Sequence, residues 1–265
     1  MITDGLGVRL RARSFTDLDQ LSGQAAGFAR QSYYASIAPS RGLEYPEDCT
    51  VFGLAFEPVN GNAQSSNQES MAWDGQQKLQ SGFIASRTNV QYMVLRSTKS
   101  EARLVVKESA AGQLPQVENH LGSRLRYLFL RDSRGDYYTA ANLASDQRAT
   151  LNKADLKAAD EEFKLLKEDV QPDYPYGYDP SSQGKSAIHF LFPDYNYWAG
   201  IDSGSSRPVM AASILETNIA VAFHPNRHPY QPGTYIAVLE SSPIVPSGVP
   251  HPREEASLHV LRGKY

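Results

Sequence analysis

The sequence predicts one β-dominated α+β domain over residues 1–265, an antiparallel sandwich or distorted barrel with an amphipathic helix at about 153–169 and a second at about 16–33. Three observations support this fold class. Short runs of alternating apolar and polar residues recur along the chain, and turn residues separate them. Helical spacing is confined to two segments. The length is sufficient for one large domain with a sizeable core.

The predicted strands combine period-2 alternation with β-branched or aromatic residues, and two pairs of them form predicted hairpins. One hairpin joins Arg124–Arg131 to Tyr137–Ala141 through the turn residues DSRGD, and the other turns at 216–218. The full set is Val8–Phe15, Thr50–Phe56, Val90–Arg96, Ala102–Lys107, Arg124–Arg131, Tyr137–Ala141, Ala187–Phe192, Arg207–Leu215, Ile219–His224, Gly233–Leu239 and Ser257–Arg262.

The two predicted helices rest on apolar residues three and four positions apart. In the later one, Leu156, Ala159, Phe163, Leu166 and Val170 form one stripe, which we expect to pack on a sheet. Asn152 is the expected N-cap, and Pro172 ends the segment. In the earlier one, Thr16 is the expected cap, although Gly23 and Gly27 each cost about 1 kcal/mol relative to alanine.

Two further segments lack a regular pattern. Residues 58–80 are rich in Asn, Gln and Ser, which predicts a polar loop. Residues 241–255 are punctuated by proline, which favours an extended connection across the outside of the domain. The strand that follows is expected to close a sheet in its own domain or in a neighbour.

Composition excludes several classes of protein. The net charge is −3, and Arg9, Arg11 and Arg13 alternate as if coating an exposed strand face, so we expect neither nucleic acid nor an acidic membrane as a partner. Cys49 is the single cysteine, which excludes an intrachain disulfide framework. With no signal-peptide pattern and no apolar run of bilayer length, we expect a soluble protein without membrane insertion, cytoplasmic or particle-associated.

The most informative feature for function is an aromatic-rich stretch between Pro172 and Trp198. It holds five of the fifteen tyrosines and one of the two tryptophans, in the runs PDYPYGYDP and PDYNYWAG. Tyr and Trp offer large, stiff contact areas at low entropic cost, as recognition surfaces require. The predicted partner- or ligand-binding residues are Tyr174, Tyr176, Tyr178, Tyr195, Tyr197 and Trp198. The predicted strand Ala187–Phe192 separates the two runs by about 20 Å, at ~3.3 Å per residue, which favours a protein surface over a small ligand.

The histidines give no convincing metal site. His224 and His228 have the i, i+4 spacing of a helical zinc site, but Pro225 and Pro229 bracket them and remove the helix. A proline-stiffened turn is the better interpretation. His189, within AIHFLF, is expected to be a satisfied, half-buried histidine. We therefore predict no metal and no cofactor.

The motifs for nucleophilic or nucleotide chemistry also fail. Glu47 and Asp48 precede Cys49 and raise the pKa of its thiol, so an inert, semi-buried thiol is expected. Residues 200–204 lack the spacing of a GxSxG elbow. Gly184-Lys185-Ser186 lacks the first glycine of a phosphate loop, because position 179 is Asp179. Arg134-Gly135-Asp136 is interpreted as a β-turn.

These observations favour a non-catalytic structural or interaction component of a larger assembly, for example a virion or tail-like particle. Its expected partners are protein subunits of the same or another chain, so an oligomer is one expected form. A carbohydrate-binding or carbohydrate-active protein is the alternative, using the same aromatics with Asp173, Asp179 or Asp194. An enzyme built around His189 or His224 is a weaker alternative. No catalytic residue is assigned.

Overall fold

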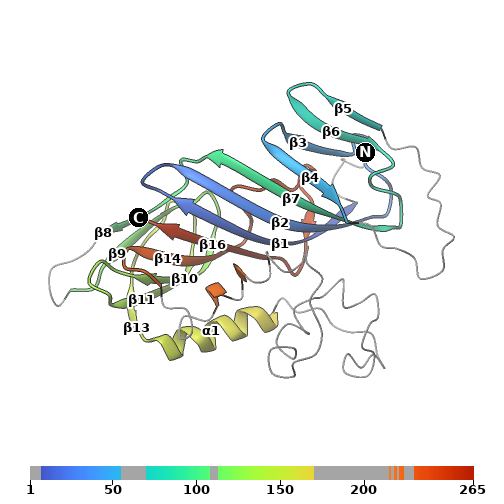
Figure 1. Cartoon of the computed structure of the whole chain (residues 1–265). Coiled ribbons are helices and arrows are strands. Elements are labelled where there is room, and N and C mark those ends of the chain that lie inside the picture. Colours follow the sequence, from blue (N-terminus) through green and yellow to red (C-terminus); the bar gives the residue numbers. More distant parts are fainter. Residues whose placement is uncertain are drawn as a thin grey trace, which may run out of the picture.

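A large open sheet organises the molecule, as the computed structural model shows (Figure 1). The structure describes residues 7–54, 70–107, 113–169, 215, 218–219, 221–223 and 230–265. Within them, ten strands form the main sheet. In spatial order, the main path is β13 (Asn152–Ala154), β11 (Tyr137–Leu143), β10 (Leu125–Arg131), β14 (Thr234–Leu239), β16 (Leu258–Lys264), β1 (Val8–Asp19), β2 (Gln24–Ala35), β7 (Asn89–Lys99) and β4 (Cys49–Gly53), with β15 (Arg253–Glu254) also pairing with β1.

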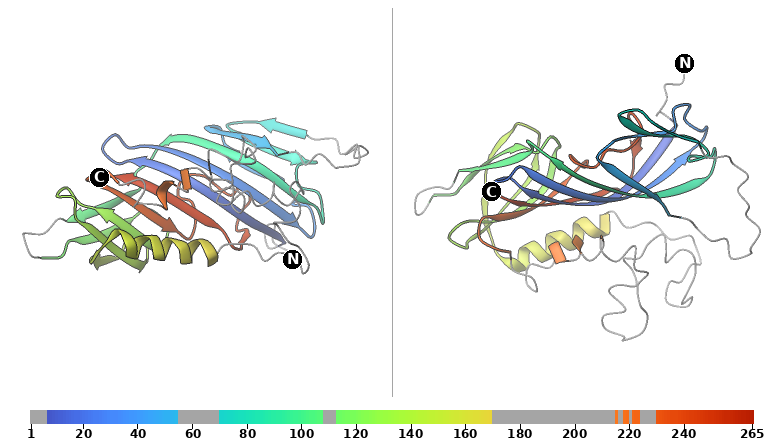
Figure 2. Two further views of the ribbon diagram at one scale, coloured as in Figure 1. Left: turned by 60° about the horizontal axis from the view of Figure 1, so that its bottom comes forward. Right: turned by 45° about the horizontal axis from the view of Figure 1, so that its top comes forward.

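Two three-stranded sheets and one helix complete the described elements. The first small sheet has the order β12 (Arg148–Thr150), β9 (Gln116–His120) and β8 (Arg103–Lys107). The second has the order β3 (Leu43–Pro46), β6 (Gln76–Ser81) and β5 (Ser70–Trp73), and it lies beside β4 at one end of the molecule (Figure 1). The helix α1 (Leu156–Asp169) lies against one face of the main sheet (Figure 2).

The β-dominated fold with one long helix confirms the predicted fold class. Two details differ from the prediction. The main sheet stays open, ending at β13 and β4 among the described residues, rather than closing into a barrel. It is also mixed, because β1 pairs in parallel with both β15 and β16 while its other neighbour, β2, is antiparallel.

Alternation along β1 places the apolar residues of the two faces in different cores. Leu10 and Ala12 join Tyr33 and Val245 in a core on one face. Phe15 is buried on the other face, where it belongs to the core formed with α1. The arginines alternate as predicted, but only the start of the row is exposed, since Arg13 is buried opposite Arg30.

The predicted helix at about 16–33 is wrong. Residues 16–19 continue β1, a turn follows, and β2 begins at Gln24. Gly27 lies inside β2, where a Cβ would stand 2.6 Å from Cγ2 of Val245. The segment is therefore rich in glycine and alanine because residues 244 and 245 pack closely on this strand, and these small residues obscured the strand pattern.

The helix predicted at 153–169 is confirmed, with a different cap. Asn152 belongs to β13, where it pairs with Thr139. The cap is Asp155, whose Oδ1 accepts a hydrogen bond from the backbone N–H of Ala158 at 2.7 Å. Phe163 on the apolar stripe stacks on Phe223, with 4.9 Å between ring centroids.

The strands predicted at Arg207–Leu215 and Ile219–His224, with a hairpin between them, are wrong in their described part. Leu215, Asn218, Ile219, Val221 and Ala222 are helical, and the N–H of Phe223 bonds the carbonyl of Ile219 at 3.0 Å. Leu215, Ile219, Ala222 and Phe223 are buried together in the core with α1. Their spacing of four, three and one is helical, and over so short a run it was mistaken for alternation.

The two segments predicted to be irregular are more ordered than expected. The described part of 58–80 contains β5 and most of β6, which form a hairpin. The proline-rich segment is not an external spacer: Ile244, Val245 and Val249 are buried in the cores. We call residues 241–252 the strap, because they cross the face of β1 and β2 opposite to α1.

Candidate functional site

The residues singled out from the sequence for function lie outside the described residues. This holds for the six predicted contact residues Tyr174, Tyr176, Tyr178, Tyr195, Tyr197 and Trp198. It also holds for His189, His224 and His228, and for Asp173, Asp179 and Asp194. Their roles stay predictions. Among the described residues, no group of three or more His, Cys, Asp or Glu side chains is arranged to hold a metal ion.

Cys49 has the character expected from its neighbours in sequence. The thiol is buried, and burial raises its pKa to about 11, with the charge of Asp48 adding to the effect and that of Arg96 opposing it. The thiol is therefore protonated near neutral pH and is a poor nucleophile.

The three-stranded sheet β3–β6–β5 carries the most exposed apolar surface that we find on paired strands. Its register forms two rows across one face: Leu43–Leu79–Met71 and Tyr45–Gln77–Trp73. Leu43, Leu79 and Tyr45 are buried in the core shared with β1 and β2, and Gln77 is buried beside them. The last residues are not, because Met71 is 57% and Trp73 59% exposed. On this face of the sheet, both buried rows therefore end at β5 in side chains that are exposed to solvent.

The edge beyond β5 has further features of a contact surface. Among the described residues, β5 pairs with β6 alone, so its other edge presents free backbone N–H and C=O groups. Gln77 is buried in the middle of the second row, and among the described residues its Oε1 has no hydrogen-bond partner, while its Nε2 lies 3.6 Å from the Met71 Sδ. An unsatisfied buried acceptor costs about 1–3 kcal/mol, so a donor from outside would be stabilising.

Sequence analysis missed this surface although a local signal was present. Met71 and Trp73 alternate before Asp74-Gly75, and Gln77 and Leu79 alternate after it. Asp-Gly between alternating runs is a strong hairpin signal, and Gly75 has the positive φ of +68° that such a turn needs. The Asn, Gln and Ser residues around this hairpin led instead to the prediction of a polar loop over residues 58–80.

A serine, a histidine and a glutamate form a second polar constellation, at the junction of β1, β15 and β16. The Ser14 Oγ lies 2.8 Å from the His259 Nδ1, and the His259 Nε2 lies 2.6 Å from the Glu254 Oε1. Burial raises the pKa of Glu254, but hydrogen bonds from His259 and Ser257 and the charge of His259 lower it more, so the net shift is downward. Sequence reasoning could not find this group, since 245 positions separate Ser14 from His259.

The three residue types are those of a hydrolase triad, but their burial and position indicate a structural role, in which they hold β1 to β15 and β16. Ser14 is 1% exposed in the middle of a paired strand, so no substrate reaches its hydroxyl in this conformation. The group lies where the pairing of β1 passes from β15 to β16. There the N–H of Ala12 bonds the Ser257 Oγ at 2.9 Å instead of a strand carbonyl.

The strap is held on the sheet by a neighbouring polar cluster. The Tyr33 hydroxyl donates toward the Ser247 carbonyl at 2.6 Å and lies 2.8 Å from the Tyr45 hydroxyl. The Gln31 Nε2 donates to the Pro246 carbonyl at 2.8 Å. Burial raises the pKa of both tyrosines well above the usual range, so they stay neutral donors.

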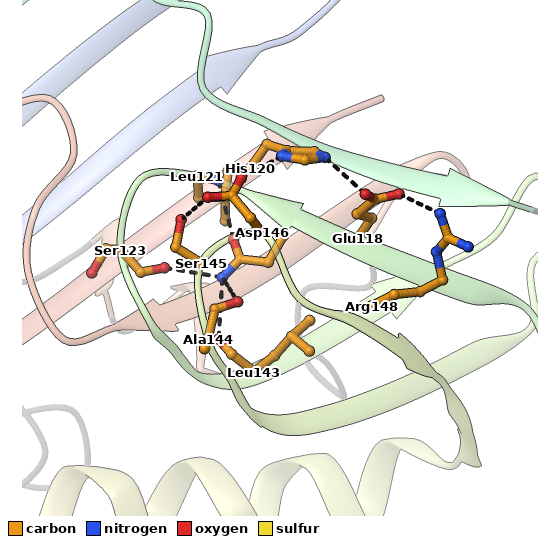
Figure 3. A network of polar contacts seen from close by, with 10 residues as sticks. Glu118, His120, Leu121, Ser123, Leu143, Ala144, Ser145, Asp146 and Arg148 are labelled. Carbon is orange, nitrogen blue, oxygen red and sulfur yellow. Dashed lines mark hydrogen bonds and ion pairs between the residues drawn. The ribbon is translucent and has the colours of Figure 1, made fainter.

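A third polar network lies at the small sheet β12–β9–β8 (Figure 3). The His120 imidazole lies between the Asp146 Oδ1, at 2.7 Å, and the Glu118 Oε1, at 3.3 Å. Arg148 bonds Glu118 at 3.0 Å, and this bond is the main cause of the lowered pKa of Glu118. The buried Asn119 side-chain amide donates hydrogen bonds to the carbonyls of Ser123, Leu143 and Ala144. Each charged group already has a partner, so this network holds the turns together.

Comparison with known proteins adds no assignment. No protein-family profile matches the chain, and no curated protein sequence matches it either. In the described part of the chain, no helix is long and apolar enough to cross a membrane.

Proposed function

We propose that the protein is a non-catalytic structural or interaction component of a larger protein assembly, such as a virion or a tail-like particle. The observation that supports this proposal is the exposed apolar surface at β5, where Met71 and Trp73 extend two buried rows into solvent. Trp and Met are enriched at protein interfaces, and an exposed strand edge pairs readily with another strand.

The polar constellations are consistent with this non-catalytic role. Ser14, His259 and Glu254 are the described residues whose types best fit nucleophilic catalysis, yet the serine is buried where no substrate could be attacked. A serine-reactive fluorophosphonate is therefore expected to leave Ser14 unlabelled in the native protein. Labelling of Ser14 in the wild type and not in Ser14→Ala, read by peptide mass spectrometry, would favour a hydrolase instead.

The proposed partner at β5 is an extended strand that pairs with the free edge and covers Met71 and Trp73 with apolar side chains on the same face. Such a strand could also bring a donor toward the Gln77 Oε1. It could belong to a second copy of this chain or to another subunit. The surface carries no charged residue within β5 itself, which suits apolar contact over electrostatic attraction.

The experiment compares Trp73→Ser with Leu21→Ser. Both replace an exposed apolar side chain, but Leu21 lies in the turn between β1 and β2. Size exclusion with light scattering, with and without co-purified subunits, is expected to show species heavier than the 29.3 kDa chain for the wild type and Leu21→Ser. Trp73→Ser should shift them toward the monomer. A wild type that stays monomeric and retains no partner contradicts the proposal.

The aromatic residues at 174–198 are proposed as a second contact surface of the same assembly. Tyr176→Ala and Trp198→Ala should weaken partner retention without lowering the melting temperature of the chain. A glycan array separates the alternative, because glycan binding that both substitutions abolish would point to carbohydrate recognition rather than to subunit contact.

A further inference from the structure

A pocket of about 260 Å³ lies between the strap and the main sheet, on the face opposite to α1. Its floor consists of Leu10, Ala12 and Ala29 from β1 and β2, and the strap forms the opposite wall. Small-molecule sites in proteins usually begin near 300 Å³, so this volume suits a small ligand.

Three polar side chains at the pocket keep hydrogen-bonding capacity. The Ser242 Oγ accepts bonds from the N–H groups of Ile244 and Val245, which leaves its own hydroxyl proton for another acceptor. The Glu254 carboxylate accepts hydrogen bonds from His259 and Ser257. Because a carboxylate has about four lone-pair positions, it can accept further hydrogen bonds. The His251 imidazole makes no hydrogen bond or ion pair with a described residue.

The backbone at His251 has a second unusual property. Its φ is +48°, in the left-handed region that residues other than glycine seldom adopt. Strained backbone of this kind persists where the surrounding structure holds it, and it gathers at ligand sites. Ala256, with the same φ of +48°, does not line the pocket and so provides a matched reference.

From this geometry we infer that the pocket binds a small uncharged polyol, such as a monosaccharide. Hydroxyl groups both donate and accept, and therefore satisfy Ser242, Glu254 and His251 together, while the C–H face of a sugar covers the apolar floor. An anion would meet the Glu254 carboxylate, and a hydrocarbon would leave the polar groups unpaired. This site is separate from the β5 surface and does not depend on the proposed assembly role.

The test is saturation-transfer NMR on the full chain with glucose, galactose, mannose and glycerol, and with gluconate as a carboxylated counterpart of glucose. At least one neutral polyol is expected to receive saturation, and gluconate is not. His251→Gly should weaken that binding about five-fold, the size of one lost hydrogen bond, and Ala256→Gly should leave it unchanged. Both substitutions relieve the same backbone conformation, so only the imidazole distinguishes them.

A third variant, Ala29→Val, adds two methyl groups at the floor and is expected to abolish binding. If Ala29→Val does not fold, as judged by its melting curve, His251→Gly with its control decides the outcome alone. The inference is overturned if no polyol receives saturation, if gluconate binds as well as glucose, or if His251→Gly binds like Ala256→Gly.

Discussion

At the scale of single residues, the chemistry of this protein is concentrated in buried polar groups that join distant parts of the chain. Ser14, His259 and Glu254 connect the start and the end of the described chain, and the bond between Ser14 and His259 is buried, whereas the bond to Glu254 is partly buried. A buried histidine between a hydroxyl and a carboxylate has both ring nitrogens satisfied, so the group stabilises the pairing of β1 with β16.

The lowered pKa of Glu254 makes a prediction about acid stability. Because the folded pKa lies below the unfolded one, the folded protein binds fewer protons. The contribution of Glu254 is full above its unfolded pKa of about 4.3 and is lost as the pH falls through the folded pKa. Urea unfolding at pH 7 should show that Glu254→Gln costs about 1–2 kcal/mol, since a charged hydrogen bond is replaced by a neutral one.

The same substitution should matter less in acid. As the pH falls through the folded pKa of Glu254, the difference between the wild type and Glu254→Gln is expected to shrink, because the wild-type carboxyl then becomes neutral as well. A difference that grows as the pH falls would show that Glu254 does not stabilise the fold as a carboxylate.

At the scale of elements, close contacts decide which residue types a strand or helix tolerates. The strap reaches its position because Gly27 in β2 leaves room for Ile244 and Val245. The helix α1 begins after Asp155, and its stripe packs on β10 through the rings of Phe163, Phe129 and Tyr127. Each of these two features can be tested by a substitution that has a matched control in the same chain.

Gly27→Ala is expected to destabilise the protein by about 1–3 kcal/mol, because the new Cβ would lie 2.6 Å from Cγ2 of Val245. Gly53→Ala in β4 is the control, since its Cβ would meet only a ring carbon of Tyr92, at 3.8 Å. The control should be neutral or slightly stabilising, as alanine restricts the unfolded chain. Equal melting temperatures for the two variants would mean that the strap does not pack on β2.

Asp155→Ala should cost about 1 kcal/mol of unfolding free energy, the usual value for a lost N-cap. Asn152→Ala is the natural comparison, because the sequence alone favours Asn152 as the cap, whereas the residue is exposed in β13. Chemical denaturation of both variants separates the two positions. A larger loss for Asn152→Ala would place the start of the helix three residues earlier.

At the scale of the whole molecule, the order of strands in the sheet predicts a gradient of stability. The most central strands, β14, β16 and β1, have paired neighbours on both sides and buried side chains on both faces. The strand β13 lies at the edge of the main sheet and β5 at the edge of the sheet β3–β6–β5. Each pairs with a neighbour on one side only among the described residues, so both should open locally at a lower free energy.

Hydrogen exchange measured on the monomeric species should therefore be slowest in β1, β14 and β16 and fastest in β5 and β13. In assembled material, the amides of β5 should become protected if a partner strand covers this edge. Protection of β5 equal to that of β16 in the monomer would show that the edge is already covered within the chain.

Local patterns were enough to predict the β-dominated class, eight of the sixteen described strands and α1. Alternation in Val8–Phe15, Arg124–Arg131 and Gly233–Leu239 reflects side chains that point in turn to the two faces of the sheet, and the stripe that includes Ala159 and Phe163 reflects the single face of α1 that packs on the core. Such periodicity depends on the geometry of the element itself, so it can be recognised without knowing which partner lies opposite.

Tertiary structure alone decided the features that depend on a partner far away in the sequence. The parallel pairing of β1 with β16, the bond between Ser14 and His259, and the contact that requires Gly27 join residues more than two hundred positions apart. Whether Met71 and Trp73 are buried likewise depends on how far the sheet extends beyond β6. No local pattern carries this information, because the free energy of these contacts comes from two surfaces that meet only when the chain is folded.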